Sequence, residues 1–329
     1  MSETRRCRVW KPGESDRRYA ESRILRADEW NRPTLRAFAE WLWRARGLEW
    51  STVAIRVHSA STFVDAVTRR TGCSCESAIR TIDIGLIEDF FVDYGRGRGM
   101  ASRRSMQAAM RCFLRFAAER GWVDEEMISA VPSLISYGLS HLPRALSDEQ
   151  MARFLEYPFR RGGCRRRDWA IVSLLACYGV RRGQVSALQL SDIDWGDRTI
   201  EFAAHKGGKA VRHALIPAVG HALVEYLRDE RPESPRRSVF LRHRRPHERL
   251  SPGAITERVR QRMVERGLPP LGPHALRHSF ATRLLCAGQP VKTIADLLGH
   301  RSLASIAIYA KVDVPRLLGI AGEWPEVGS

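Results

Sequence analysis

The sequence predicts a mainly α-helical protein of two parts, with one small antiparallel sheet in the second part. Apolar residues recur at three- and four-residue intervals along most of the 329 residues, which is the spacing of one helix face. That periodicity stops at residues 133–144, a stretch with glycine and proline that we interpret as a linker. Two short apolar segments flank Gly207 and Gly208, a pattern that is typical of a β-hairpin.

The first part is predicted to begin with a polar arm and to continue as a bundle of helices. Residues 1–30 are rich in arginine and show no sustained periodicity, so we expect a flexible or loosely packed arm. Apolar spacing then predicts four helices, over 34–45, 51–67, 77–94 and 102–120. We expect the second of these helices to break before Val64, and Gly121 to cap the last one.

The second part is predicted to be helical around one hairpin. Ser147 and Gln150 fit a capping box, in which two side chains satisfy the first amides of a helix, so helix restarts there. Residues 192–197 are expected to turn the chain, and residues 199–203 and 210–216 to form the hairpin. The expected helices cover 168–178, 183–190, 218–231, 251–266, 273–287, 291–298 and 302–310.

The charge of the chain predicts a polyanionic partner. There are 54 basic and 37 acidic residues, a formal net charge of +17, of which +12 lies after Leu142. A surface of that sign attracts nucleic acid. No apolar run is long enough for a bilayer and the N-terminus lacks an apolar segment, so we expect a cytoplasmic, nucleoid-associated protein without a membrane partner. No second Cys or His pair accompanies Cys73 and Cys75, so we expect neither a metal nor a cofactor.

Several side chains of the second part have the chemistry to break a phosphodiester without a metal. This reaction needs a nucleophile, cationic donors for the developing charge and an acid for the leaving alkoxide. His274 and Arg277 share one face at a helix start, where an anion is favoured. Arg181 follows a helix break, and its guanidinium suits bidentate contact with phosphate. His300 lies at another break, and Tyr309 is the candidate nucleophile.

Each of these residues also has a simpler interpretation. A single arginine is usually a solvated surface charge, a histidine near a helix end is often a cap, and a tyrosine among apolar residues usually belongs to the core. The order and spacing of the five residues favour the functional interpretation, because together they match a known family.

The span from about Leu142 to Ala321 resembles the catalytic domain of tyrosine recombinases, the phage-integrase family. The matching motifs are Tyr178-Gly179-Val180-Arg181, His274-Ala275-Leu276-Arg277, Leu298-Gly299-His300 and Tyr309. Lys206 in the hairpin turn matches the catalytic lysine of the family, and Lys209 is the weaker candidate for that role. Only five of the 54 basic residues are lysines, and one retained at this turn fits the need for an ammonium acid.

The resemblance also implies how the chain is divided. The expected segments are a flexible basic arm (1–30), a helical, SAM-like core DNA-binding domain (31–132), a linker (133–144), a mixed α+β catalytic domain (145–321) and a C-terminal tail (322–329). The first helical part is similar to the family's core-binding domain only in size and helix content.

The resemblance implies catalysis by Arg181, Lys206, His274, Arg277, His300 and Tyr309. Tyr309 would attack a DNA phosphate, giving a 3′-phosphotyrosyl link and a free 5′-hydroxyl. The two arginines would offset the charge on the nonbridging oxygens, and Lys206 would protonate the leaving 5′-oxygen. His274 would assist proton movement at the tyrosine, and His300 would hydrogen-bond the phosphate. Because the phosphotyrosyl link conserves bond energy, resealing needs neither ATP nor a metal.

The implied partners are double-stranded DNA and further copies of the chain. A homotetramer would act on paired DNA sites in the integration or excision of a mobile element, alone or with a partner recombinase or accessory protein. Weaker candidates for DNA contacts are Arg103, Arg104, Arg111, Lys209 and Arg212. The tail after Tyr309 docks on a neighbouring subunit in this family, but it could equally pack on its own domain.

One residue departs from the family pattern. Three residues after the first arginine the family usually has an acidic residue, and this chain has Gln184, which can hydrogen-bond but supplies no counter-charge to Arg181. Two alternatives therefore stay open beside a site-specific recombinase. One is a DNA-binding accessory protein of the same fold with reduced or no catalysis, and the other is an activity like that of type IB topoisomerases.

Overall fold

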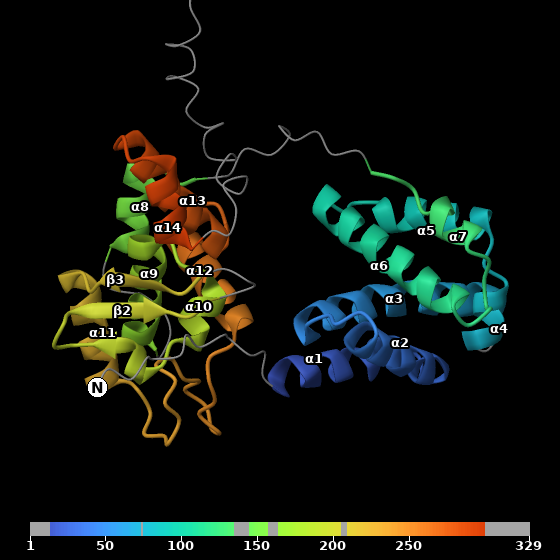
Figure 1. Ribbon diagram of the computed structural model, residues 1–329, viewed down its shortest axis with the longest axis horizontal. Helices are drawn as coiled ribbons and strands as arrows, with labels where there is room; N and C mark the ends of the chain where they lie inside the picture. Colours follow the sequence, from blue (N-terminus) through green and yellow to red (C-terminus); the bar gives the residue numbers. More distant parts are fainter. Residues whose placement is uncertain (1–13, 74, 135–144, 157–163, 205–208, 300–329) are drawn as a thin grey trace, which may run out of the picture. The chain divides into compact units, whose positions relative to one another are not determined.

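The computed structural model describes residues 14–73, 75–134, 145–156, 164–204 and 209–299 (Figure 1). Contacts within the chain group these residues into two compact units, the first within residues 11–138 and the second within 139–329. The fold class predicted from the sequence is confirmed, because the described residues are mainly α-helical and contain one three-stranded antiparallel sheet. The finer division into linker, catalytic domain and tail stays a prediction.

The first unit is a bundle of helices around an aromatic core. Its elements are α1 (Glu14–Ile24), η1 (Glu29–Asn31), α2 (Arg32–Arg44), α3 (Trp50–Thr71), α4 (Cys75–Arg80), α5 (Ile84–Gly95), α6 (Met100–Ala118) and α7 (Glu126–Ala130). The ring of Phe38 lies 5.2 Å from the rings of Phe113 and Phe116, both edge-on. Phe63 of α3 joins them. These buried rings supply the apolar area that stabilises the bundle.

Three expectations for the first unit were wrong. The flexible arm up to residue 30 is instead helical from Glu14 onward, because Ile24 is buried and α1 packs along α3. Helix α3 continues through Val64 without a break. Val64 is buried together with Phe63 and Val67 of the same helix. The helix expected over 77–94 is divided in two, because the Asp83 carboxylate accepts a hydrogen bond from the Leu86 amide and starts α5 anew.

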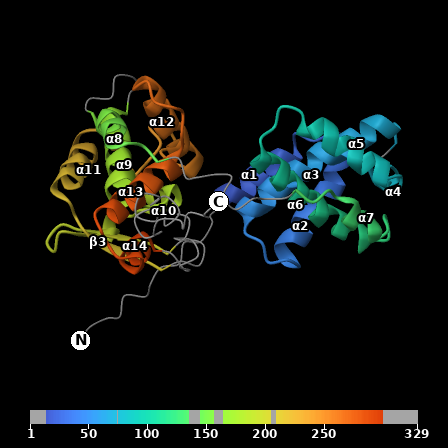
Figure 2. The same cartoon turned by 90° about the horizontal axis from the view of Figure 1, so that it is seen from above.

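The second unit is built around helix α9. Its elements are α8 (Asp148–Leu155), α9 (Arg165–Tyr178), α10 (Arg182–Ala187), η2 (Leu190–Asp192), β1 (Ile193–Asp194), β2 (Thr199–Phe202), β3 (Val211–Ala214), α11 (Pro217–Asp229), α12 (Pro252–Glu265), α13 (Pro273–Cys286) and α14 (Val291–Leu298). Figure 2 shows α9 between α11 and α12. Six consecutive residues of α9, from Ala170 to Leu175, are completely buried or nearly so. The predicted capping box at Ser147 and Gln150 is present at the start of α8.

The sheet has one strand more than the sequence predicted. Residues 192–197 were expected only to turn the chain, but β1 pairs with β2, with Ile193 opposite Ile200. Both isoleucines are buried, which explains why the two-residue strand forms. The predicted pairing of β2 with β3 is confirmed. The turn of this hairpin, residues 205–208, and the helix expected over 302–310 lie outside the described residues.

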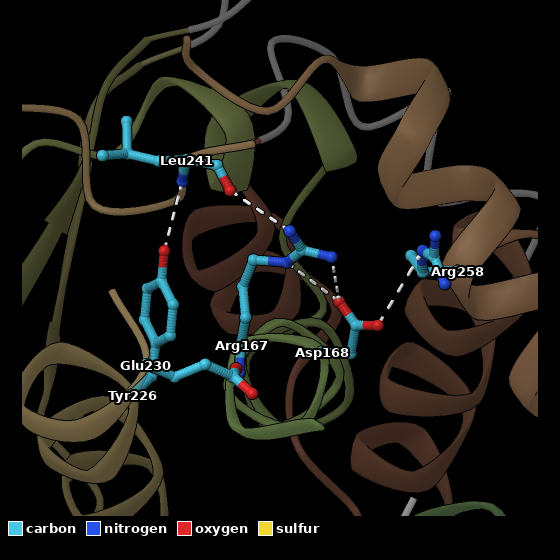
Figure 3. A network of polar contacts seen from close by, with 6 residues as sticks. All are labelled: Arg167, Asp168, Tyr226, Glu230, Leu241 and Arg258. Atoms are coloured by element: carbon cyan, nitrogen blue, oxygen red, sulfur yellow. Dashed lines mark hydrogen bonds and ion pairs between the residues drawn. The ribbon is translucent and has the colours of Figure 1, made fainter. Parts of the chain in front are cut away.

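A buried ion pair fixes the start of α9 (Figure 3). Arg167 donates from Nε and Nη2 to one carboxylate oxygen of Asp168, at 3.0 and 2.8 Å, and from Nη1 to the carbonyl of Leu241 at 3.2 Å. Burial raises the pKa of Asp168, while the guanidinium of Arg167 opposes that shift. Arg258 of α12 approaches the other carboxylate oxygen at 3.8 Å, and Glu230 at the end of α11 accepts from the Arg167 amide at 2.7 Å. The network therefore joins four segments.

None of the helices in the described parts is long and apolar enough to cross a membrane. Within the same residues, no group of three His, Cys, Asp or Glu side chains is arranged to hold a metal ion.

Candidate active site

Arg277 is the buried centre of the candidate site. Its Nη1 donates to the carbonyl of Gly179 at 2.8 Å, and its Nη2 donates to the carbonyl of Leu298 at 2.9 Å. These carbonyls lie at the C-terminal ends of α9 and α14, where the helix dipoles favour a cation. One guanidinium thus brings together three of the sequence motifs: the one that ends at Arg181, the one that contains His274 and Arg277, and the one that begins at Leu298.

Two glycines permit the close approach of these segments. Gly179 has φ +59°, and a Cβ atom there would lie 2.7 Å from the Phe280 ring and 2.9 Å from Leu298. Gly299 has φ +62°, and its Cβ would lie 2.9 Å from Val211 and 3.2 Å from a backbone oxygen of the hairpin. At these distances no side chain fits at position 179 or 299 unless the neighbouring atoms move. The end of α14 therefore rests directly on the strand that follows the hairpin turn.

Gln184 connects Arg181 to the hairpin. Arg181 is half-buried directly before α10, and its amide donates to Oε1 of Gln184 at 3.0 Å. The other end of the amide, Nε2, donates to the carbonyl of Ala203 at 3.1 Å. Ala203 directly follows β2, on the side that leads into the hairpin turn. Gln184 is 4% exposed, so both bonds form away from water. The side chain acts here as donor and acceptor at once, a role that a carboxylate cannot fill.

Replacing Gln184 with glutamate is expected to destabilise the second unit by about 1–3 kcal/mol at neutral pH, because the carboxylate would face the Ala203 carbonyl without a proton to donate. The protonated acid can restore that bond, so the deficit should shrink as the pH falls. Urea unfolding between pH 7.5 and pH 5 measures this change. Gln184→Met lacks both bonds and is the control, since its deficit should not depend on pH in this way. Equal pH profiles for the two variants would contradict this role.

The two histidines near Arg277 differ in their environment. His274 is exposed in the first turn of α13. His278 is half-buried, and burial, with smaller contributions from His274 and Arg277, lowers its pKa from 6.5 to about 4. His278 is therefore neutral near pH 7. The positive charge beside His278 is therefore that of Arg277, and not that of His278 itself.

Two side chains to which the sequence analysis assigned no role, Tyr178 and His213, also position the hairpin. The Tyr178 hydroxyl donates to the carbonyl of Ala214 and accepts from the amide of Ile216, both at 2.9 Å. The His213 ring is buried 5.0 Å from the ring of Tyr178, and burial lowers its pKa. The backbone of Leu297 in α14 acts on the pKa of His213 in the opposite direction. From the sequence, only the alternation of the strand, which places His213 on its inward face, could have indicated that His213 positions the hairpin.

The structure describes part of the predicted catalytic set. Arg181, His274 and Arg277 are described, and the bonds of Arg277 and Gln184 join the segments that carry them. Lys206, His300 and Tyr309 lie outside the described residues. The catalytic roles of all six residues stay predictions at this point.

Three of the five weaker candidates for DNA contacts, Arg103, Arg111 and Arg212, bind other groups of the protein. In the second unit, Lys209 is exposed, and Arg212 is exposed and pairs with Glu201 at 3.3 Å. In the first unit, Arg103 donates to the carbonyls of Gly95 and Arg98. Arg111 donates to the Val131 carbonyl and the Ser133 hydroxyl, both at 2.9 Å, and Arg104 is half-buried. The bonds of Arg103 and Arg111 fix the backbone of their own unit, and contact with DNA stays a prediction for all five.

The chain belongs to the phage integrase family, whose members are tyrosine recombinases. Residues 144–316 match this family, which is more than half of the chain. A putative integrase/recombinase of Sinorhizobium fredii, y4gC, is 38% identical over 188 residues, which cover 56% of this chain and 97% of the relative. A second, y4rA, is 35% identical over 231 residues, 69% of this chain. The tyrosine recombinase XerC of Roseiflexus sp. is 33% identical over 68% of this chain and 72% of its own length. The chain spans little more than half, 56%, of y4rA.

Solved structures show the same fold. The XerH recombinase in its post-cleavage complex with a palindromic difH substrate matches 96% of this chain and 90% of its own, with a TM-score of 0.63 and 20% identity. A lambda integrase dimer bound to a COC′ core site matches 90% of this chain and 98% of its own, with a TM-score of 0.60 and 17% identity.

Proposed function

We propose that this protein is a site-specific recombinase that cleaves and rejoins double-stranded DNA through a 3′-phosphotyrosyl intermediate. The observation that carries the proposal is the position of Arg277, a buried cation bonded at once to the ends of two helices that lead into the other two motifs. Membership of the phage integrase family and relatives named integrase/recombinase support the same reaction class.

The proposed mechanism divides the reaction among six side chains. Tyr309 attacks the phosphorus, and Arg181 and Arg277 offset the charge that develops on the nonbridging oxygens. Lys206 gives a proton to the leaving 5′-oxygen, and the two site histidines, His274 and His300, assist at the tyrosine and the phosphate. A phenol has a pKa near 10, so attack at neutral pH needs this cationic surrounding. Two helix C-termini hold the Arg277 charge in place before DNA binds.

The proposed assembly is a homotetramer on two paired DNA sites, acting in the integration or excision of a mobile element. The solved structures of similar fold include XerH bound to its difH substrate and a lambda integrase dimer bound to a core site, which supports DNA as the partner. In this proposal the first unit is a core DNA-binding domain, and residues 145–321 form the catalytic domain.

Replacement of the nucleophile tests the proposal. Wild-type protein is expected to become covalently attached to a nicked suicide DNA substrate that carries its crossover site, and Tyr309→Phe is expected to abolish the adduct while DNA binding persists. Tyr94→Phe, a half-buried tyrosine of the first unit, is the matched control and should keep the adduct. Denaturing gel electrophoresis separates free and DNA-linked protein. An adduct that persists in Tyr309→Phe would contradict the assignment.

One observation favours a second candidate, an accessory DNA-binding protein without catalysis. Gln184 gives Arg181 no counter-charge, although its two hydrogen bonds hold the segment in place. Specific DNA binding by wild-type protein without any covalent product would select this alternative. Relaxation of any supercoiled plasmid by dilute protein would instead indicate a topoisomerase.

A further inference from the structure

The connection between α11 and α12 is strongly basic and lies outside the motifs of the candidate site. From Arg236 to Arg249 the chain contains six arginines, two histidines and a single acidic residue, Glu248. These 14 residues carry a formal charge of +5, nearly a third of the net charge of the whole chain. Two loops contribute to it, residues 231–238 and the hairpin 241–250, which we call the basic loops.

Most of this charge has no counter-charge in the described structure. Glu248 is shared by Arg236, at 4.0 Å, and Arg242, at 3.6 Å. Among the described residues, no ion pair or side-chain hydrogen bond engages Arg237, Arg244 or Arg245, and all three are exposed. An arrangement of exposed arginines that nothing neutralises is unfavourable by itself and favours a bound polyanion.

The backbone of the basic loops is fixed. In the hairpin, the amide of Arg242 donates to the carbonyl of Glu248 at 2.7 Å. In the other loop, Arg231 donates to the carbonyls of Arg236, at 2.7 Å, and Ser238, at 3.0 Å. The two loops line a common hollow of about 530 Å³, with Arg236 and the acidic Glu233 on one side and Arg245 on the other. A surface held in this way loses little conformational entropy when it binds a ligand.

The base of the basic loops lies at the end of α9 opposite to the one that Arg277 binds, and it also contacts α10, where the Ser186 hydroxyl donates to the carbonyl of Leu250 at 2.7 Å. Their base is fixed to the start of α9, where Arg167 binds the Leu241 carbonyl, and Tyr226 accepts from the Leu241 amide at 3.2 Å. Arg277 binds the carbonyl of Gly179 at the other end of α9. Twelve residues of α-helix separate the two ends, which is about 18 Å at 1.5 Å per residue. Figure 1 shows these loops, in gold and orange, projecting below the unit and away from α14.

We propose that the basic loops are a second binding surface for the phosphate backbone of double-stranded DNA, separate from the candidate active site. Arginine forks match phosphate oxygens in bidentate contacts, and a duplex presents one negative charge per about 1.7 Å of its axis. The loops contain none of the six predicted catalytic residues, so they bind phosphates other than the cleaved one. They add affinity and fix the register of the protein, and they take no part in the chemistry. The choice of DNA as the polyanion rests on the proposed function.

A triple substitution tests the surface in the full-length protein. Changing Arg237, Arg244 and Arg245 to glutamine is expected to weaken duplex binding between about 100- and 1000-fold at 0.1 M salt, and to reduce the slope of log K against log salt by about 3. Fluorescence anisotropy with a duplex of at least 30 base pairs measures both. The triple lysine variant keeps the charges at the same positions and should stay within about tenfold of wild type. Thermal unfolding should be unchanged, since all three side chains are exposed.

The possible results distinguish a failure of this binding surface from a failure of the proposed recombinase function. At saturating protein, the rate of covalent adduct formation should be the same in the glutamine variant as in wild type. A slower rate at saturation would overturn the proposal, as would unchanged duplex affinity and salt slope. Loss of binding only to single-stranded RNA would assign the loops to RNA and overturn it too. Wild-type protein that binds duplex through these arginines but forms no adduct would contradict the proposed function alone.

Discussion

Arg277→Lys is expected to lower the rate of covalent adduct formation by about 10²- to 10³-fold while costing only about 1–2 kcal/mol of stability. The ammonium keeps the charge and can serve one of the two carbonyls that Arg277 binds, so the fold survives. It lacks the planar fork that binds a phosphate through two parallel bonds. Single-turnover cleavage of the suicide substrate gives the rate, and urea unfolding gives the stability.

Arg277→Ala extends the same test. Both carbonyls then lose their buried donor, and we expect a stability loss of about 2–5 kcal/mol together with the loss of cleavage. Arg283→Lys is the matched control on the same helix, because Arg283 is exposed and makes only one long bond, 3.5 Å to the carbonyl of Ala176. It should behave as wild type. Full cleavage activity in Arg277→Lys would show that Arg277 has a structural role only.

Asp168→Asn is expected to have the largest effect on stability, a loss of about 3–5 kcal/mol. The substitution removes the charge opposite Arg167, which is 5% exposed and has no access to water for compensation. Arg258 lies 3.8 Å from the carboxylate and would lose its partner as well. The free energy of unfolding in urea, measured at pH 7, checks the value.

A double variant separates the ion pair from its packing. Arg167→Met with Asp168→Leu removes both charges, and we expect it to recover most of the stability lost in Asp168→Asn, because no buried charge then remains unpaired. The Leu241 carbonyl loses one donor in this variant, so recovery should be incomplete. If Asp168→Asn were as stable as wild type, the network would not hold the start of α9.

Much of the helical fold could be predicted from the sequence, and the failures have local causes. The bounds of α6, α12 and α13 were predicted to within two residues, and in α6 and α12 the reason is that each helix buries one apolar face. Helix α1 escaped notice, since its residues are mostly polar and only a few, such as Ile24, are buried. The strand β1 escaped too, because two residues give no period to detect.

The candidate site was predicted in part. The motifs around Arg181 and Arg277 could be located because their residue types and spacing match a family, and the structure brings these segments together. Their contacts could not be predicted, because a partner such as the Leu298 carbonyl depends on where two helices end in space. The donor role of Gln184 toward Ala203 was missed for the same reason, since the two residues are 19 positions apart in the chain and meet only in the folded unit.

The amide bridge of Gln184 matters for anyone who engineers this protein. Consensus redesign replaces unusual residues with those most frequent among relatives, and such exchanges commonly stabilise a fold. At position 184 this rule would introduce a negative oxygen against the Ala203 carbonyl, where the present side chain offers a hydrogen. A stabilised version of the enzyme should therefore keep glutamine at this site.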